Sequence, residues 1–165
     1  MLLNVGDSVS LSANAAARAS WVDKTLARVR GSWLDGAVFD YESPLDKTPG
    51  SSTAARAASY VALVNETTAA LHTALPGSLT AVCVAWSPDI GEWNPDDGRN
   101  YDYPALAAAS DLTYIMAYDT RSYVIDRCVA SANAPITAAV RGATRYLQLG
   151  IPADKLIVGI PWYGY

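Results

Sequence analysis

The chain has 165 residues, a length typical of one domain, and 51% of them are hydrophobic, which is enough to form a core. Its net charge of −4 at pH 7 comes without a basic cluster, which argues against nucleic acid as a partner. No apolar run is long enough to cross a bilayer, so we expect no membrane partner. Ten tyrosines and five tryptophans supply aromatic rings with polar edges, which suit sugar faces as well as ordinary cores.

Hydrophobic periodicity predicts strands and helices that alternate along the chain. In chain order we expect a strand at 2–5, a helix at 15–30, a strand at 33–39, a helix at 54–75, a strand at 79–85, a helix at 104–109, a strand at 112–117, a helix at 135–149 and a strand at 156–160. Polar stretches rich in Pro, Gly and Ser separate several of these elements and predict loops.

This alternation predicts an α/β fold with parallel strands, because each crossover returns the chain to the same edge of the sheet. Strands that begin roughly 30 to 45 residues apart fit a (β/α)8 TIM barrel with long loops. No glycine-rich phosphate loop follows a strand, which disfavours a nucleotide-binding doubly wound sheet. Five strands do not close a barrel that usually takes about 250 residues, so we expect an incomplete barrel from the middle of a longer protein. A missing start would also explain why no signal peptide is visible.

Few residues are available for metal or thiol chemistry. Cys83 lies inside a strand pattern and is interpreted as a buried small apolar residue, while Cys128 follows a loop and could pair with another thiol. The single histidine, His72, lies in a helical pattern where we expect it at the surface, which disfavours a Ser-His-Asp or Cys-His mechanism. Neither cysteine has neighbours at metal-ligand spacing, so we expect no metal and no cofactor.

The most informative stretch runs from Asp35 to Glu42 and predicts a buried strand that ends in two carboxylates. Side chains two apart in a strand point the same way, so Val38, Asp40 and Glu42 share one face. Like charges held close together raise a pKa, so one of the two carboxyls could stay protonated near neutral pH and serve as an acid. This pair suits glycosidic bond cleavage, although acidic residues after a strand are also common as helix caps or solvated loop residues.

Further polar and aromatic residues follow the other predicted strands at their carboxyl ends, where barrel enzymes keep their active sites. They are Trp86 after the third strand, Tyr118 and Asp119 after the fourth, and Trp162 and Tyr163 after the fifth.

Three ordered motifs resemble those of family 18 glycoside hydrolases, the chitinase-like enzymes. The family signature D-G-x-D-x-D-x-E is matched by Asp35, Gly36, Asp40 and Glu42, while Val38 departs from it. The family motif M-x-Y-D is matched by Met116, Tyr118 and Asp119, and the motif G-x-P-x-Y-G by Gly159, Pro161, Tyr163 and Gly164. In this frame residues 1–165 form a partial catalytic barrel that runs from its third to its seventh strand.

The resemblance implies substrate-assisted, retaining hydrolysis of oligosaccharides that contain N-acetylglucosamine, of chitobiose-core or chitin type. It implies that Glu42 is the general acid and base, that Asp40 holds the acetamido N–H, and that Tyr118 orients the acetamido group. Asp119 would bind sugar hydroxyls, and the aromatic rings would line the substrate cleft, although for each of them a core role is an equal alternative; these rings are Trp86, Trp162 and Tyr163.

The resemblance also assigns structural roles and one departure. Asp35 would anchor the start of the strand, and Gly36 would allow close packing. The family often has Asp or Asn where this chain has Val38, so Asp40 loses a possible hydrogen-bond partner and we expect an altered pH dependence or a reduced rate.

We expect an oligosaccharide as the partner, and a monomer in the complete form. A lysosomal or secreted location is implied by the resemblance and is compatible with the glycosylation triplet at Asn65–Thr67. Two alternatives stay open. One is a sugar-binding barrel without catalysis, which the retained Glu42 disfavours, and the other is an inactive truncated fragment.

Overall fold

The computed structural model describes residues 2–3, 13–45, 52–89, 99–120 and 132–164. Cys128, whose pairing the sequence left open, and most of the loops predicted at 43–53, 87–103 and 121–133 lie outside these ranges.

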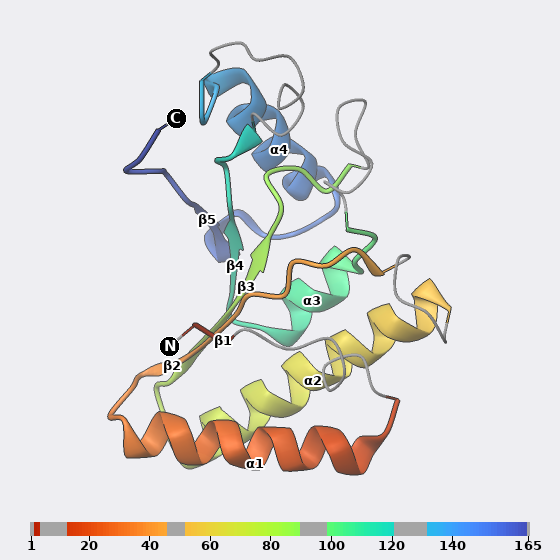
Figure 1. Cartoon of the computed structure of the whole chain (residues 1–165), viewed down its shortest axis with the longest axis vertical. Coiled ribbons are helices and arrows are strands. Elements are labelled where there is room, and N and C mark those ends of the chain that lie inside the picture. Colours follow the sequence, from red (N-terminus) through yellow and green to blue (C-terminus); the bar gives the residue numbers. More distant parts are fainter. Residues whose placement is uncertain (1, 4–12, 46–51, 90–98, 121–131, 165) are drawn as a thin grey trace.

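The described residues form a parallel sheet whose strands follow the order of the sequence (Figure 1). The strands are β1 (Leu2–Leu3), β2 (Gly36–Phe39), β3 (Leu79–Val84), β4 (Leu112–Ile115) and β5 (Leu156–Val158), and every neighbouring pair is parallel. The helices are α1 (Ala15–Gly31), α2 (Thr53–Ala74), α3 (Tyr103–Ala109) and α4 (Ile136–Gln148). A sheet that adds one strand per helical crossover, always in the same direction, is the architecture expected of part of a TIM barrel.

The predicted order and type of the elements are confirmed, but β2, β3, β4 and β5 are each one to three residues shorter than expected. The second strand begins at Gly36, since Trp33 belongs to the end of α1 instead. Trp33 has φ 56°, and the amides of Trp33 and Leu34 donate to the carbonyls of Arg30 and Val29, which is the Schellman pattern of a helix end. The last strand stops at Val158, two residues before the predicted end.

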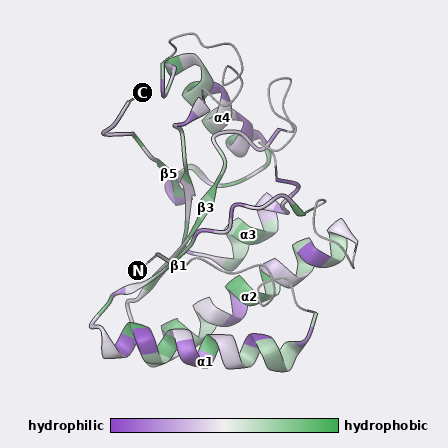
Figure 2. Cartoon of the chain, viewed as in Figure 1, coloured by the Kyte–Doolittle hydropathy of each residue, from purple (hydrophilic) through white to green (hydrophobic). Residues whose placement is uncertain are grey.

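One face of the sheet packs against the helices and forms the core. Phe39, Val82, Val84 and Ile115 point to this face, where they meet residues of α1 and α2, and all four are buried. Figure 1 shows the helices along one side of the strands, and Figure 2 shows hydrophobic and hydrophilic residues interspersed along α1, as expected of a helix with one buried face. The hydrophobic core therefore lies between this face of the sheet and the helices.

The opposite face of the sheet lines a shallow hollow of about 370 Å³. Its floor comes from alternate residues of four strands, namely Val38, Ala81, Leu112, Tyr114 and Ile157. In a TIM barrel this face points to the barrel interior, and its residues lead up to the active-site end. Val38 therefore faces the same way as Asp40, as the alternation of side chains predicted.

Gly36 starts β2 where no side chain would fit. A Cβ atom built there would lie 1.8 Å from the carbonyl oxygen of Leu79, and the φ angle of Gly36 is 157°. The amide of Leu79 donates to the carbonyl of Asp35 across the same junction, at 3.0 Å. The prediction that Gly36 allows close packing is therefore confirmed. The contact of Asp35 at this junction comes from its backbone carbonyl, so an anchoring role of its side chain stays a prediction.

Candidate active site

The two carboxylates predicted at the end of β2 lie together on the face opposite the core. Ala37, Phe39 and Tyr41 are buried among the helices, whereas Asp40 is half-buried and Glu42 is exposed. Burial, and then the charge of Glu42, raise the pKa of Asp40, while the charge of Arg99 and a hydrogen bond with Cys83 lower it in part. Of the two carboxyls, Asp40 is thus the one whose protonated form the fold favours.

Cys83 is a neighbour of Asp40 that sequence reasoning did not assign to the site. Val38 pairs with Ala81 and Phe39 with Val82, so the next step of the register sets Asp40 beside Cys83. Cys83 is buried as predicted, and burial followed by the charge of Asp40 raises its pKa to about 12. The neutral thiol is therefore a hydrogen-bond donor to Asp40 from the adjacent strand, where Val38 supplies none from below.

Arg99 is the second residue that sequence reasoning missed. Its Nη2 atom donates to Oε2 of Glu42 at 2.8 Å, although 57 positions separate the two residues. The side chain of Arg99 is only 12% exposed, while that of Glu42 is 56% exposed. The guanidinium of Arg99 is therefore largely buried, and it binds the carboxylate of Glu42 on the side that faces away from solvent.

A second cluster forms after β4 and joins two of the predicted motifs. The hydroxyl of Tyr163 donates to Oδ2 of Asp119 at 2.7 Å, and the rings of Tyr163 and Tyr118 meet edge to face at 6.2 Å. Asn133 completes the cluster, because its Oδ1 accepts from the amide of Asp119 at 2.7 Å and its Nδ2 donates to the carbonyl of Tyr163 at 3.0 Å. These bonds hold Asp119 in a left-handed conformation with φ 55°.

Tyr118 belongs to this cluster and follows β4, which is separated from β2 and its acid pair by β3. Burial, and then Tyr114 and Cys83, raise the pKa of Tyr118 well above its usual value, so its hydroxyl keeps its proton. Cys83, on the strand between them, affects the pKa of both Asp40 and Tyr118. The sheet thus gathers the carboxylates after β2 and the phenol after β4 at one end, as parallel strands require.

The two predicted tryptophans differ in their surroundings. Trp86 follows β3 and is buried, and its carbonyl oxygen packs so closely on α4 that a Cβ at Gly142 would lie 1.8 Å away. Trp162 is fully exposed and so makes no aromatic wall with Tyr163 among the described residues, whereas Tyr163 itself is half-exposed. Tyr163 contacts a residue predicted to be catalytic, since its ring packs against that of Tyr118.

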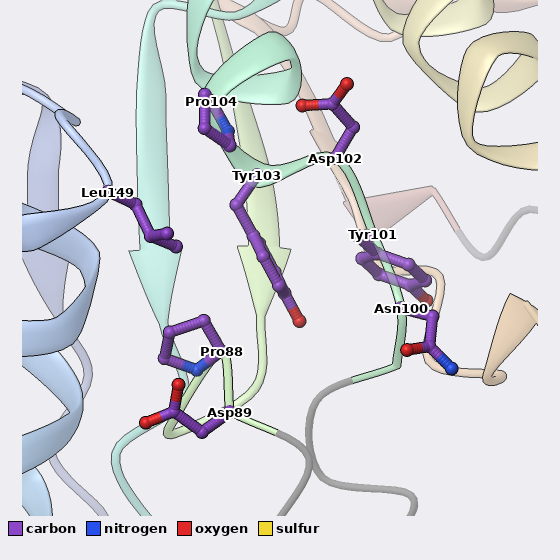
Figure 3. A pocket seen from close by; sticks show the side chains of 8 residues that line it. All are labelled: Pro88, Asp89, Asn100, Tyr101, Asp102, Tyr103, Pro104 and Leu149. Atoms are coloured by element: carbon purple, nitrogen blue, oxygen red, sulfur yellow. The ribbon is translucent and has the colours of Figure 1, made fainter. Parts of the chain in front are cut away.

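A separate pocket of about 520 Å³ lies beside the connection from β3 to α3 (Figure 3). Its lining includes Tyr101, Tyr103 and Asp89, and the last of these is bound to Arg145 of α4 by a bidentate ion pair. The described residues contain no group of three or more His, Cys, Asp or Glu that could hold a metal ion. Nor does any helix in the described part of the chain have both the length and the apolar composition needed to span a bilayer.

A parallel α/β sheet with carboxylates and a phenol at its carboxyl-terminal end has the arrangement of the active-site end of a barrel enzyme. The model of the family described as "Glycosyl hydrolases family 18" matches residues 3–165, and the chain belongs to this family. It is 38% identical to di-N-acetylchitobiase of Rattus norvegicus over 152 residues and 35% identical to the Homo sapiens protein of that name over 150 residues. These matches cover 92% and 91% of this chain.

The solved structures include a GH18 chitinase from Cycas revoluta in complex with (GlcNAc)3, which is 26% identical and superposes with a TM-score of 0.76. The superposition covers 98% of this chain and 48% of the chitinase chain. The chain likewise spans 39% of the rat relative and 36% of the human relative. The match therefore extends over nearly the whole chain but over less than half of each relative.

Proposed function

We propose that the chain is part of the catalytic barrel of a glycosidase that hydrolyses oligosaccharides containing N-acetylglucosamine. The observation that carries this proposal is the acid pair at the end of β2, where Glu42 and Asp40 occupy the acidic positions of the family signature. The names of the relatives, di-N-acetylchitobiase and chitinase, support a substrate of chitobiose-core or chitin type. The domain assignment is residues 1–165 as one partial barrel.

The mechanism proposed is substrate-assisted and retaining, one of the exceptions to the usual pair of carboxylates with a carboxylate nucleophile. Glu42 protonates the leaving oxygen, and the acetamido oxygen of the substrate attacks the anomeric carbon to give an oxazolinium-type ring. Glu42, now a carboxylate, then takes a proton from the water that opens this ring. A general acid of this kind contributes roughly 10²- to 10⁴-fold to the rate.

Asp40 and Tyr118 would hold the acetamido group in position for this attack. A carboxylate at Asp40 accepts the acetamido N–H and balances the positive charge of the forming ring, and Cys83 supplies a hydrogen bond on its other side. Tyr118 keeps its proton and donates it in a hydrogen bond to the acetamido oxygen. Holding the two reacting groups in place can lower the barrier by about 7–11 kcal/mol in the best intramolecular cases.

Other residues of the site would contact parts of the sugar outside the acetamido group. Asp119 accepts hydrogen bonds from sugar hydroxyls, and its bond from Tyr163 fixes the direction of the carboxylate. Trp86 and Trp162 are proposed cleft residues as well; the full exposure of Trp162 leaves its ring available to a sugar face. The proposed location is lysosomal or secreted, and the proposed complete form is a monomer.

The test uses two proteins: the 165-residue chain, and a completed enzyme in which this chain replaces the matching 152 residues of the rat relative. Both are incubated with N,N′-diacetylchitobiose and with the same disaccharide lacking its acetyl groups. We expect the completed enzyme to release N-acetylglucosamine from the acetylated substrate alone, because only that substrate carries the internal nucleophile. Binding without hydrolysis would replace the proposal with a sugar-binding barrel, and equal hydrolysis of both substrates would refute the mechanism. If the completed enzyme is active and the 165-residue chain is not, the chain by itself is an inactive fragment.

A further inference from the structure

The segment 99–101 contacts the backbone on both sides of the proposed catalytic acid. The hydroxyl of Tyr101 donates to the carbonyl oxygen of Tyr41 at 2.8 Å and to that of Ser43 at 3.0 Å. A tyrosine carries one hydroxyl hydrogen, so this hydrogen is shared between two acceptors. Those acceptors belong to the residues immediately before and after Glu42, and a single buried phenol therefore holds the peptide group that enters Glu42 and the one that follows Ser43.

Arg99 adds two contacts to the same stretch. Its guanidinium donates to the carboxylate of Glu42, and its own carbonyl oxygen accepts the amide of Leu45 at 3.0 Å. The residues after β2 are thus held at 41, 42, 43 and 45 by one short segment that lies far away in the sequence. Arg56 of α2 holds the end of the same stretch, because its Nη1 donates to the carbonyl oxygen of Leu45.

The backbone of this segment is held in an unusual conformation. Arg99 has φ 50° and Asn100 has φ 57°, both in the left-handed region that residues with a side chain rarely adopt. Two such residues in succession persist only where the surrounding contacts determine the conformation, and they concentrate at functional sites. Figure 3 shows Asn100, Tyr101 and Tyr103 on the stretch that leads into α3.

A cluster of tyrosines fixes the ring of Tyr101. Its ring centroid lies 5.9 Å from that of Tyr41, 5.5 Å from that of Tyr60 and 5.8 Å from that of Tyr103. Burial raises the pKa of Tyr101 far above its usual value, so the hydroxyl keeps its proton near neutral pH and can donate. The ring of Tyr101 is therefore packed against three other tyrosine rings.

We infer that residues 99–101 form a strap that positions the general acid, with Tyr101 as a positioning residue that acts through the backbone around Glu42. This inference rests on the proposed function, since it assigns the strap to the acid named there. The strap holds the peptide groups in place, and the Arg99 guanidinium holds the carboxylate until substrate enters. Its effect belongs to the chemical step and not to the binding of the sugar.

The test compares Tyr101→Phe with Tyr60→Phe in the completed enzyme. Both variants remove one hydroxyl from a buried ring of the same cluster, but the hydroxyl of Tyr60 has no hydrogen-bond partner among the described residues. We expect Tyr101→Phe to lower kcat at least tenfold with KM unchanged, because a misplaced acid affects the transition state more than the bound substrate. Tyr60→Phe should leave both constants unchanged. Equal kcat values for the two variants would overturn the inference.

Amide hydrogen exchange supplies a readout that does not depend on activity. The amide of Leu45 donates to Arg99, so Tyr101→Phe should speed its exchange at least tenfold relative to amides of β3, and Tyr60→Phe should not. Unchanged exchange in Tyr101→Phe would overturn the strap even if kcat fell. A completed enzyme that folds but never hydrolyses the substrate would remove the proposed function, and the exchange measurement would still decide whether the strap holds this stretch.

Discussion

Replacing Gly36 by alanine tests whether the close contact between β2 and β3 holds the strand that carries the acid pair. The added Cβ would lie 1.8 Å from the carbonyl oxygen of Leu79 and 2.8 Å from its carbonyl carbon, both of which are backbone atoms. Reaching an ordinary contact of 3.4 Å requires a displacement of about 1.6 Å. The hydrogen bond between the amide of Leu79 and the carbonyl of Asp35 spans this junction and would be stretched or broken.

The cost can be estimated from two contributions. A side chain forced into the φ of 157° found at Gly36 costs about 1–3 kcal/mol. A lost backbone hydrogen bond adds about 0.5–1.5 kcal/mol. We therefore expect Gly36→Ala to lower the free energy of unfolding by about 2–4 kcal/mol, a large part of the 5–15 kcal/mol typical of a domain.

Urea unfolding followed by circular dichroism measures this cost, and two further glycines separate its causes. Gly77 has φ 89° but no atom within 4 Å of the added Cβ, so Gly77→Ala carries only the conformational cost of about 1–2 kcal/mol. Gly31 ends α1 with no atom near its Cβ and no positive φ, so Gly31→Ala should be neutral or stabilising by up to about 1 kcal/mol. If Gly36→Ala were no more destabilising than Gly77→Ala, the argument from the strand contact would be refuted.

For three other substitutions the structure determines whether the free energy of unfolding rises or falls. Trp33→Gly should raise the free energy of unfolding by about 0.5–1 kcal/mol in urea, because Trp33 is exposed and left-handed at a helix end, and a decrease would contradict this. Burial alone would raise the pKa of Asp111, but hydrogen bonds from Thr80 and His72 outweigh it and lower the pKa. Asp111→Asn should therefore destabilise the fold at pH 7 by about 1–3 kcal/mol, and the gap to wild type should close as the pH falls below about 4; a constant gap would count against it. The raised pKa of Asp40 means that its contribution to stability is full below about pH 3.9 and is lost as the pH rises through the folded pKa, so Asp40→Asn should be more stable than wild type at pH 7 and equal to it near pH 3. An Asp40→Asn variant that unfolds more easily at pH 7 would contradict the raised pKa.

Local patterns predicted the fold because they depend on near neighbours in the chain. Short apolar runs located β2, β3 and β4, and the alternation of side chains along a strand placed Val38, Asp40 and Glu42 on one face. The misplaced start of β2 has a local cause as well, since Trp33 occupies a left-handed position that is usually glycine, and an apolar residue there extends the strand pattern.

The missing site residues depend on contacts between distant segments. Arg99 reaches Glu42 across 57 positions, and no period or spacing in the sequence relates a loop arginine to a strand-end carboxylate. Cys83 was correctly predicted to be buried, but its place beside Asp40 follows from the register of β2 with β3, which the sequence does not specify. Asn133 joins Asp119 and Tyr163 only because the chain after β4 and the chain after β5 end side by side.

The central claim is that Glu42 acts as the acid and base of a glycosidase, and the most direct test is Glu42→Gln in the completed enzyme. Glutamine keeps the shape of the side chain but cannot give up a proton to the leaving oxygen. We predict that hydrolysis of N,N′-diacetylchitobiose falls by about 10²- to 10⁴-fold, while circular dichroism still shows the folded protein and the binding of N-acetylglucosamine oligosaccharides by calorimetry stays unchanged. Hydrolysis by Glu42→Gln at the wild-type rate would contradict the account.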